Sequence, residues 1–341
     1  MALWWLLPIL FALFLSLVLT AVVRYLALRY SLVDNPDGGR KLHSSAIPLG
    51  GGVAIYLAFA LPTLVVLITT NHFTSGAIRP LAFVGLLLGG LVLILGGLLD
   101  DRYSLSAKRS IIFPVLASLI AVICGIGVTK LTNPFGSPFL LPAAISSIFT
   151  FLWLLSTTYT TKLLDGLDGL ATSISTVAAL LIMALSLSIK FWQPDVALLA
   201  AIAVAALLGF LLWNWHPARI FLGEGGSTFL GFLVGVLAVI SGGKVATALL
   251  VLGLPALDVV FVIIRRLARR QNPFTASDRD HLHYLLLDYG LSARQVVLLY
   301  ITLAVIFGVT TLFLVSWQKL IILAILATVA GLMAISLHKT N

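Results

Sequence analysis

Apolar runs separated by short polar segments fill almost the whole chain. Eleven of these runs approach the roughly 20 residues that an α-helix needs to cross a bilayer. They cover approximately residues 2–23, 51–70, 81–99, 111–128, 143–161, 170–189, 196–213, 228–241, 245–264, 295–315 and 320–337. The pattern predicts an all-α polytopic membrane protein with about 11 transmembrane helices, in a single domain over residues 1–341.

The composition supports lipid as the main solvent of the chain. Hydrophobic residues make up 60% and charged residues only 10%, whereas a soluble domain carries about 25% charged residues. The first apolar run has no basic start, so we expect a spanning helix there rather than a cleaved signal peptide. The single cysteine, Cys124, excludes an intramolecular disulfide.

The distribution of basic residues predicts the orientation. The net charge of +9 is spread between apolar runs, which favours membrane topology over nucleic-acid binding. Of the 21 lysines and arginines, all but five fall in one set of loops, which should be cytoplasmic. The five exceptions are Arg79, Lys130, Lys190, Lys244 and Lys319. The N-terminus is then outside and the C-terminus inside.

The acidic residues gather on the same side as the basic ones. Of the 12 acids, only Asp195 faces outside in this topology, and only Asp258 lies within a predicted span. Because topology rules say little about carboxylates, the gathering indicates a cytoplasmic active site. An ionisable residue inside a span is a functional candidate by default. Asp258 has two open alternatives, an ion pair with a basic group or a hydrogen bond between helices.

Two pairs of aspartates carry the strongest chemical signal. Asp100 and Asp101 are adjacent at the end of the third run, where they repel each other unless a cation lies nearby. The plain alternative is a charged helix end. Asp165 and Asp168, in Asp-Gly-Leu-Asp-Gly, share one face of a helical turn, and their glycines permit close approach of a ligand. The alternative here is a glycine-rich capped turn.

Two further segments suit phosphate binding. Residues 214–227 contain Asn214, Arg219 and the only glutamate, Glu224, which we expect in a glycine loop that wraps a phosphate. Arg219 has the planar fork that binds diphosphates, or it is an ordinary positive-inside residue. The longest predicted cytoplasmic loop contains His281 and His283. Two histidines without a cysteine are too few ligands for a typical zinc site, so contact with phosphate is favoured.

Together these segments resemble the polyprenyl-phosphate N-acetylhexosamine-1-phosphate transferase superfamily, glycosyl transferase family 4. The motifs occur in the family's order between about residues 34 and 284. They are Arg-Lys-x-His with Pro-x-Gly-Gly, Asp-Asp before Leu-Ser-x-Lys, Asp-Gly-Leu-Asp-Gly-Leu-Ala, Pro-Ala-Arg-Ile-Phe-x-Gly and Asp-Arg-x-His-x-His. Eleven spans and His-x-His are similar to the branch that uses UDP-N-acetylglucosamine-type donors, rather than the peptidoglycan branch with ten spans and three adjacent histidines.

The resemblance implies a reaction and a site. Undecaprenyl phosphate and a UDP-N-acetylhexosamine would give undecaprenyl-diphospho-sugar and UMP at the bacterial inner membrane, with Mg²⁺, or alternatively Mn²⁺, as cofactor. A homodimer is left open. The implied catalytic residues are Asp100, Asp101, Asp165 and Asp168, and the implied metal ligands are Glu224 and Asp168. The implied substrate-binding residues are Lys41, His43, Lys108, Lys162, Asn214, Arg219, His281 and His283.

The chain departs from the family pattern at two linked places. Tyr159 and Lys162 stand where the family has two asparagines, and Glu224 stands where it has an aspartate. We expect Lys162 and Glu224 to be neighbours, with the ammonium group partly replacing the charge of the metal. The alternative is that Glu224 still binds magnesium while Lys162 only touches phosphate. Magnesium is the default, because four aspartates and a diphosphate exceed what one lysine neutralises.

Two other classes of function remain as alternatives. A secondary transporter of a polar or anionic solute is the rival, but such proteins place binding groups near the midplane and often show internal repeats. This chain has its polar clusters at predicted cytoplasmic helix ends and shows no repeat. The departures at Tyr159 and Lys162 also leave room for a catalytically inactive relative. For an active enzyme, single displacement is favoured over a covalent aspartyl-phosphate.

Overall fold

The structure is a computed structural model, and it describes residues 3–36, 45–76, 78–131, 133, 136–189, 191–242, 245–268, 270, 280–314 and 316–339. The first half contains η1 (Leu3–Trp5), α1 (Leu6–Arg29), β1 (Val33–Asp34), β2 (Ile47–Pro48), α2 (Gly51–Thr69), α3 (Pro80–Tyr103), α4 (Ala107–Ser110), α5 (Ile112–Ile123), β3 (Lys130–Leu131), β4 (Phe139–Leu140) and α6 (Ala143–Leu164). The second half contains α7 (Leu170–Leu187), α8 (Pro194–Asn214), α9 (Gly223–Ile240), α10 (Val245–Val251), α11 (Gly253–Ala268), α12 (Leu282–Asp288), α13 (Ala293–Phe313) and α14 (Ser316–Lys339).

The helices confirm an all-α polytopic membrane fold. Within the described residues, eight helices are long and apolar enough to cross a bilayer, namely α1, α2, α3, α6, α7, α8, α9 and α13. The bent pair α10 and α11 can form a ninth span. Helix α5 has only 12 residues, and the apolar stretch of α14, Trp317–Met333, is also shorter. The count of eleven therefore stays a prediction.

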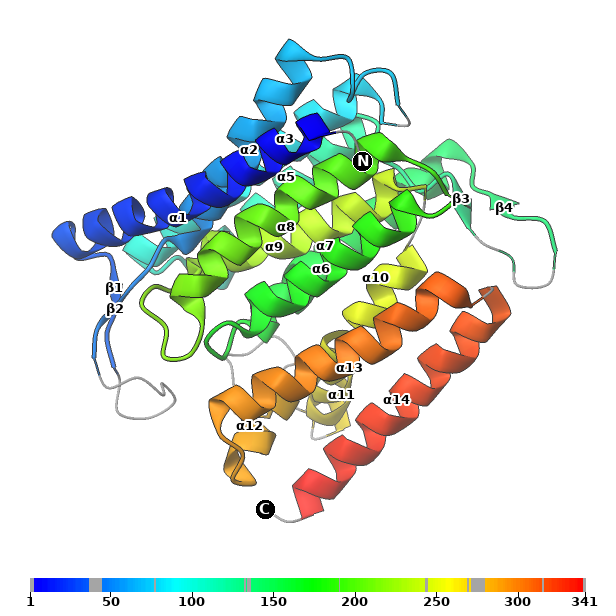
Figure 1. Ribbon diagram of the computed structural model, residues 1–341. Helices are drawn as coiled ribbons and strands as arrows, with labels where there is room; N and C mark the ends of the chain where they lie inside the picture. Colours follow the sequence, from blue (N-terminus) through cyan, green and yellow to red (C-terminus); the bar gives the residue numbers. More distant parts are fainter. Residues whose placement is uncertain are drawn as a thin grey trace.

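The two most buried spans, α8 and α9, form the centre of the bundle. Helix α8 is apolar on every side and rich in alanine, which is typical of a helix surrounded by other helices. It packs on α1, α2 and α7, while α9 packs on α3 and α6 (Figure 1). The short hairpins β1–β2 and β3–β4 lie at opposite ends of the bundle. The connections between α3 and α5, α6 and α7, and α8 and α9 lie at the end with β1–β2.

Helix α9 begins five residues before the predicted span at 228, which corrects the expected glycine loop around Glu224. Gly225 and Gly226 lie inside the first turn of α9, where they contact Gly97 of α3 and Gly52 of α2. A Cβ atom on Gly52, Gly97 or Gly226 would collide with the opposite backbone, and one on Gly225 would be tightly packed against the backbone of α3. The glycines therefore allow three helices to approach closely, and they do not wrap a ligand.

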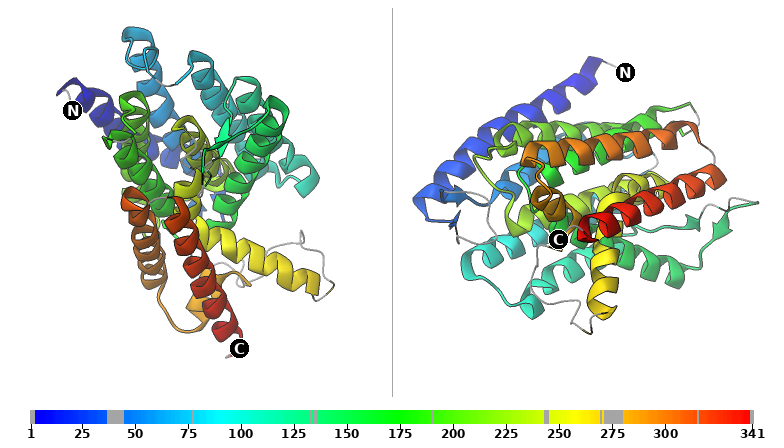
Figure 2. Two further views of the ribbon diagram at one scale, coloured as in Figure 1. Left: turned by 90° about the vertical axis from the view of Figure 1, so that its right-hand side faces the viewer. Right: turned by 90° about the horizontal axis from the view of Figure 1, so that it is seen from below.

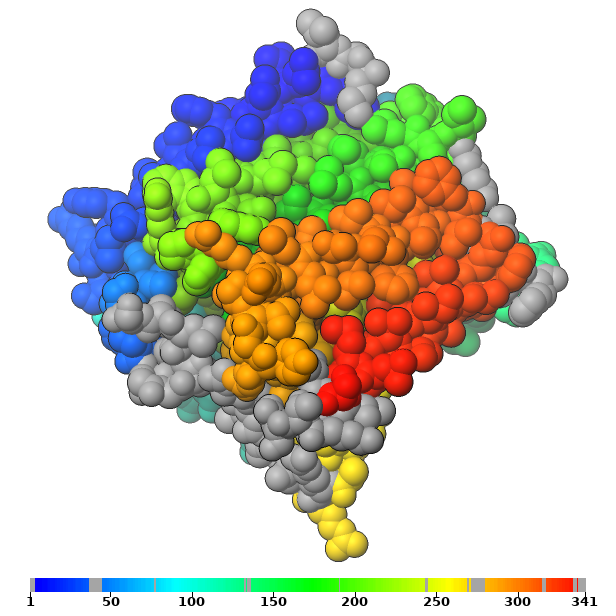
Figure 3. Space-filling model, turned by 60° about the horizontal axis from the view of Figure 1, so that its bottom comes forward, coloured from blue at the N-terminus to red at the C-terminus, as the bar shows by residue number. Residues whose placement is uncertain are grey.

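The predicted span 245–264 is broken. Helices α10 and α11 meet at Leu252 and differ in direction by 73°. Figure 2 shows α11 leaving the bundle at an angle, beside α12 and α14. Helix α12 contacts both α13 and α14, and Figure 3 shows these three segments together on one face of the molecule. The break places Asp258, on α11, close to α12.

Candidate active site

Helix ends from distant parts of the sequence meet at one end of the bundle. The C-terminal ends of α3, α6 and α8 lie there, with the N-terminal ends of α7 and α9. Hydrogen bonds and ion pairs connect side chains from different helix ends. Neighbouring spans alternate in direction, so every second connection between them lies at this end of the bundle. The predicted gathering of carboxylates is therefore present in the structure.

Lys162 and Glu224 are neighbours, as the linked departures in the sequence predict. The Nζ atom of Lys162, in the last turn of α6, lies 2.7 Å from Oε2 of Glu224, in the first turn of α9. Both side chains are partly exposed. Each charge also suits its own helix, since acids favour N-terminal ends and bases favour C-terminal ends. The ion pair thus closes the junction between α6 and α9.

The adjacent aspartates at the end of α3 have different environments. Asp101 accepts a hydrogen bond from the backbone N–H of Glu224, at 3.0 Å, so it caps α9 inside the carboxylate cluster. Asp100 accepts bonds from the Leu105 N–H, at 2.9 Å, and from the Ser110 hydroxyl, at 2.6 Å. Both oxygens of Asp100 therefore hold the connection between α3 and α5. Asp101 is the member of the pair that bonds to the backbone of Glu224, while Asp100 lines a small hollow together with Glu224.

The Asp-Gly-Leu-Asp turn joins α6 to α7. Asp168 Oδ2 lies 2.7 Å from His216 Nδ1 and accepts a hydrogen bond from the backbone N–H of Ala218 at 3.0 Å. Asp165 accepts no hydrogen bond from the residues that the structure describes. Burial, together with the negative charges of Glu224, Asp101 and Asp168, raises the pKa of Asp165 to about 8. The cluster is therefore short of positive charge.

The loop between α8 and α9 is held by Asn214, which the resemblance implied as a substrate-binding residue. Its buried amide donates to the Ile220 carbonyl at 3.0 Å and accepts from the Thr172 hydroxyl at 2.9 Å. Both ends of the amide are bonded inside the protein and hold this loop, and its contact with substrate stays a prediction. Arg219 is exposed in the same loop, with its guanidinium 5.9 Å from the centre of the Trp213 ring.

The other implied substrate-binding residues have different outcomes. Lys108 is exposed on the short helix α4, near the end of α3. Lys41 and His43 lie outside the described residues. His283 is buried, and its ring lies against Gly166, in the turn between Asp165 and Asp168. The structure therefore brings the His-x-His segment to the carboxylate cluster, although the two are more than one hundred residues apart in sequence.

Two residues at this end were not among the predicted site residues. His216 pairs with Asp168, and Asp258 Oδ2 lies 2.8 Å from His281 Nδ1. His216 directly precedes the Pro-Ala-Arg motif but belongs to no recognised motif itself. Asp258 was noted as the one acid within a predicted span, but a partner on α12 follows only from the break between α10 and α11. The structure thus pairs an aspartate with a histidine at two places.

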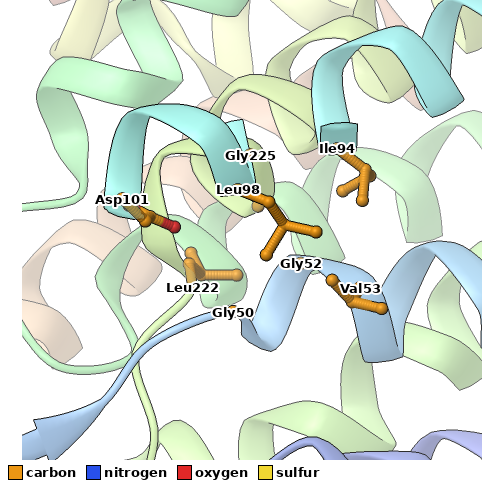
Figure 4. A pocket seen from close by; sticks show the side chains of 9 residues that line it. Gly50, Gly52, Val53, Ile94, Leu98, Asp101, Leu222 and Gly225 are labelled. Carbon is orange, nitrogen blue, oxygen red and sulfur yellow. The ribbon is translucent and has the colours of Figure 1, made fainter. Parts of the chain in front are cut away.

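Small hollows lie beside the acidic residues. One is formed mainly by apolar groups of α2, α3 and α9, with Asp101 at its edge (Figure 4). Its lining consists of Gly50, Gly52, Val53, Ile94, Leu98, Asp101, Leu222, Gly225 and Gly226. A second hollow includes Asp100, Ser110 and Glu224. Carboxylates here stand next to apolar groups of the packed helices.

The residues of the cluster suit a hard divalent cation in kind and in charge. Four carboxylates, from Asp101, Asp165, Asp168 and Glu224, face one ammonium group, and carboxylate oxygens are the ligands that Mg²⁺ prefers. Among the described residues, no three acidic, histidine or cysteine side chains are arranged to hold a metal ion. Glu224 is paired with Lys162, and Asp168 with His216.

Comparison with known proteins gives the family. The model of glycosyl transferase family 4 matches residues 83–242, which contain both aspartate pairs, Lys162 and Glu224. A Bacillus subtilis protein named as a probable undecaprenyl-phosphate N-acetylglucosaminyl 1-phosphate transferase is 31% identical over 319 residues, with 91% of this chain and 86% of that protein covered.

Two further relatives have related names. A decaprenyl-phosphate N-acetylglucosaminephosphotransferase of Mycolicibacterium smegmatis is 30% identical, with 91% of this chain and 83% of that protein covered. An undecaprenyl-phosphate α-N-acetylglucosaminyl 1-phosphate transferase of Thermotoga maritima is 32% identical, with 79% and 78% covered. Similarity over nearly the full length, with the matched motifs gathered at one site, means that the chain belongs to glycosyl transferase family 4.

Proposed function

We propose that this protein transfers an N-acetylhexosamine-1-phosphate from a UDP-sugar to a polyprenyl phosphate and releases UMP. N-acetylglucosamine is the proposed sugar, because the relatives are named for it. The observation that carries the proposal is the meeting of Asp101, Asp165, Asp168, Glu224 and Lys162 at one end of a bundle of apolar helices. The substrates combine a lipid tail with several phosphates, and this end offers both environments.

The place of the cluster suits a lipid-linked acceptor. The tail of a polyprenyl phosphate stays in the bilayer, while its phosphate reaches the level of the helix ends. Asp101 there stands beside apolar groups of α2, α3 and α9. The nucleotide is soluble and arrives from the aqueous side. We therefore place the reaction at the lipid–water boundary.

The proposed chemistry is a single displacement. An anionic oxygen of the acceptor phosphate attacks the phosphorus that carries the sugar, a new P–O bond forms, and the bond from that phosphorus to the oxygen of UMP breaks. Such a transfer needs positioning and charge neutralisation more than it needs a base. Arg219 and Lys162 supply positive charge toward the phosphates. Should the acceptor arrive protonated, Asp101 is better placed than Asp100 to take the proton, since both oxygens of Asp100 accept bonds within its own loop.

We propose Mg²⁺, with Mn²⁺ as the alternative, as the cofactor. Glu224 and Asp168 would hold the ion, with Asp165 as the third carboxylate that has no hydrogen bond in the described structure. When bound, the ion would neutralise charge on the diphosphate. Lys162 supplies part of this positive charge permanently, since it forms an ion pair with Glu224 at 2.7 Å. A bound metal ion would then have less negative charge to neutralise than the four carboxylates carry by themselves.

The finer topology follows from the same proposal. Eleven spans, with the N-terminus outside and the C-terminus in the cytoplasm, place the carboxylate cluster where nucleotide sugars occur. A bacterial inner membrane is the matching location, since the relatives are bacterial. Most lysines and arginines lie in the loops at the end of the cluster, as the positive-inside rule requires. A homodimer is compatible with this arrangement and is not needed for it.

The test uses purified protein in detergent with undecaprenyl phosphate and a panel of UDP-sugars. UMP release that requires the lipid acceptor, and is fastest with UDP-N-acetylglucosamine, is the expected result. Omitting the acceptor gives the matched control, because hydrolysis of the donor alone would release UMP without it. Absence of UMP with every donor, together with solute uptake into vesicles, would favour the transporter alternative.

A further inference from the structure

Asp258 is a buried carboxylate on α11 that makes two hydrogen bonds to one short segment. The residue is 8% exposed. Its Oδ2 lies 2.8 Å from Nδ1 of His281, and its Oδ1 accepts a bond from the backbone N–H of Leu282, also at 2.8 Å. A buried carboxylate is costly unless its oxygens are satisfied. Here both oxygens are satisfied by the first residues of α12.

The two bonds fix the start of α12 in position and in orientation. His281 is the residue that precedes the first turn of α12, and its backbone is extended there. One oxygen of Asp258 holds the backbone of the turn, and the other holds the ring of His281. The break between α10 and α11 directs α11 toward α12 and so makes the contact possible. A straight helix over residues 245–268 would not have this direction.

The contact also decides which ring nitrogen of His281 carries the proton. A carboxylate accepts hydrogen bonds, so Nδ1 of His281 is the donor and holds a hydrogen. The ring makes no other hydrogen bond to the described part of the chain. Its Nε2 is thus the nitrogen available to a ligand. Neighbouring groups are His283 and the Arg265–Asp280 ion pair, with Tyr300 of α13 near Asp258.

The His281 ring is linked to the carboxylate cluster through α12. It lies parallel to the His283 ring, with an angle of 9° and 5.8 Å between centres. His283 contacts Gly166, and the Tyr284 hydroxyl donates to the Gly166 carbonyl at 3.4 Å. Gly166 belongs to the turn that carries Asp165 and Asp168. The position of α12 therefore sets how the two histidines stand against that turn.

We propose that Asp258 is a positioning residue for the transfer reaction and acts through His281. It orients the imidazole and keeps the proton on Nδ1, which leaves Nε2 to face the phosphates. Asp258 itself does not touch substrate. This inference rests on the proposed function for its kinetic part, whereas the state of the His281 ring can be tested without any substrate.

The variant Asp258→Asn separates orientation from packing. The amide has the same shape, and its oxygen can still accept from Leu282 N–H, but its NH₂ group now faces Nδ1 of His281. The ring proton should then move from Nδ1 to Nε2. Nitrogen NMR of protein labelled with ¹⁵N-histidine detects this change, with His281→Gln identifying the signal. The same tautomer in wild type and Asp258→Asn would overturn the inference.

The kinetic arm measures UMP release with undecaprenyl phosphate and UDP-N-acetylglucosamine. For histidines that bind metals, loss of the outer hydrogen-bond partner typically costs about 10- to 100-fold, and we expect Asp258→Asn to lower kcat by a similar factor. Asp258→Glu should restore part of it. In a His281→Gln background, Asp258→Asn should cause no further loss, because its effect passes through the ring.

The matched control is Asp195→Asn. Asp195 is also buried, and its Oδ2 accepts the backbone N–H of Ile78 at 2.8 Å, at the opposite end of the bundle. This variant should keep the wild-type kcat. Full activity of Asp258→Asn, or losses that add in the double variant, would contradict the positioning role. If wild type itself releases no UMP, the proposed function fails, while the nitrogen spectrum still decides the state of His281.

Discussion

A single ammonium group among four carboxylates distinguishes this site at the scale of residues. Lys162 lies 2.7 Å from Glu224, and the charges of Glu224, Asp101 and Asp168 act on Asp165. The ammonium group offsets negative charge where a divalent cation would otherwise bind. We therefore expect Lys162 and the proposed metal ion to compete for the same carboxylates.

Lys162→Asn should tighten the binding of a divalent cation in the absence of substrate. Removing one positive charge next to Glu224 frees that carboxylate and strengthens the local negative field. We expect about a 10-fold lower Kd for Mn²⁺, which corresponds to about 1.4 kcal/mol. Titration of Mn²⁺ by electron paramagnetic resonance measures it. Lys130→Gln, an exposed lysine at the far end, is the control, and unchanged or weaker binding in Lys162→Asn would reject the competition.

The buried ring of His283 predicts a pH dependence of stability. Burial lowers the pKa of His283 to about 4 from its usual value of 6.5, so the folded protein binds fewer protons than the unfolded chain between these values. Above pH 6.5 the ring is neutral in both states and costs no stability. As the pH falls from 6.5 toward 4, the free energy of unfolding decreases by up to about 1.4 kcal/mol per pH unit.

The melting temperature in detergent, followed from pH 7.5 to pH 4.5, tests this contribution. Wild type should lose more stability on acidification than His283→Gln, which cannot be protonated. His72→Gln is the control, because His72 is exposed near the other end of the bundle. Parallel curves for wild type and His283→Gln would show that the ring is not held in its neutral form.

At the scale of elements, close contact between α3 and α9 positions Asp101 against Glu224. Gly97 and Gly225 meet where these helices cross, and a methyl group on Gly97 would collide with the backbone of Gly225. Gly97→Ala should lower the free energy of unfolding by about 1–3 kcal/mol, the usual cost of overpacking. A lower melting temperature is the measurement.

Gly331→Ala provides the matched substitution for that test. Gly331 is also helical, on α14, but a methyl group there would make only ordinary contact with Phe261 at 3.4 Å. Alanine favours helix over glycine, so this variant should be neutral or slightly stabilising. If both variants behave alike, the crossing of α3 and α9 is not set by its glycines.

The sequence predicts helices well where apolar runs are long, and less well where glycines interrupt them. The sequence predicts the start of α9 too late, because the pattern of Gly223, Gly225 and Gly226 is typical of a loop. Only their contacts with α2 and α3 show that they belong to a helix. Gly253 and Pro255 follow the break at Leu252, and proline suits the first turn of a new helix, but the apolar run continues across both residues. The direction of the break follows from packing against distant segments, including α13 and α14.

The same limit applies to the site. The Lys162–Glu224 pair could be predicted, because both residues depart from the family pattern together. His216 and Asp258 could not, since each is a single residue whose partner is brought near only by the fold. The motif predicts a substrate contact for Asn214, and the structure adds that its amide bonds to Thr172 and Ile220. Motifs therefore indicate which segments meet, and not which side chains face the ligand.

At the scale of the whole molecule, the charge distribution predicts orientation. The end with the carboxylate cluster should face the cytoplasm, because most basic residues lie in its loops. Single cysteines test this in a Cys124→Ser background. In spheroplasts, a membrane-impermeant maleimide should label Lys130→Cys directly and Arg109→Cys only after permeabilisation. Both positions are exposed, and the reverse pattern would place the cluster outside.

The central claim is that separate helix ends form one phosphoryl-transfer site, and its most direct measurement is the rate at which UMP and lipid diphosphate appear together. Wild type should form the two products in equal amounts. Asp168→Asn should slow both at least about 100-fold, as loss of a charge-stabilising group does, while Asp195→Asn at the opposite end keeps the wild-type rate. Equal rates for wild type and Asp168→Asn, with both variants correctly folded, would contradict the account.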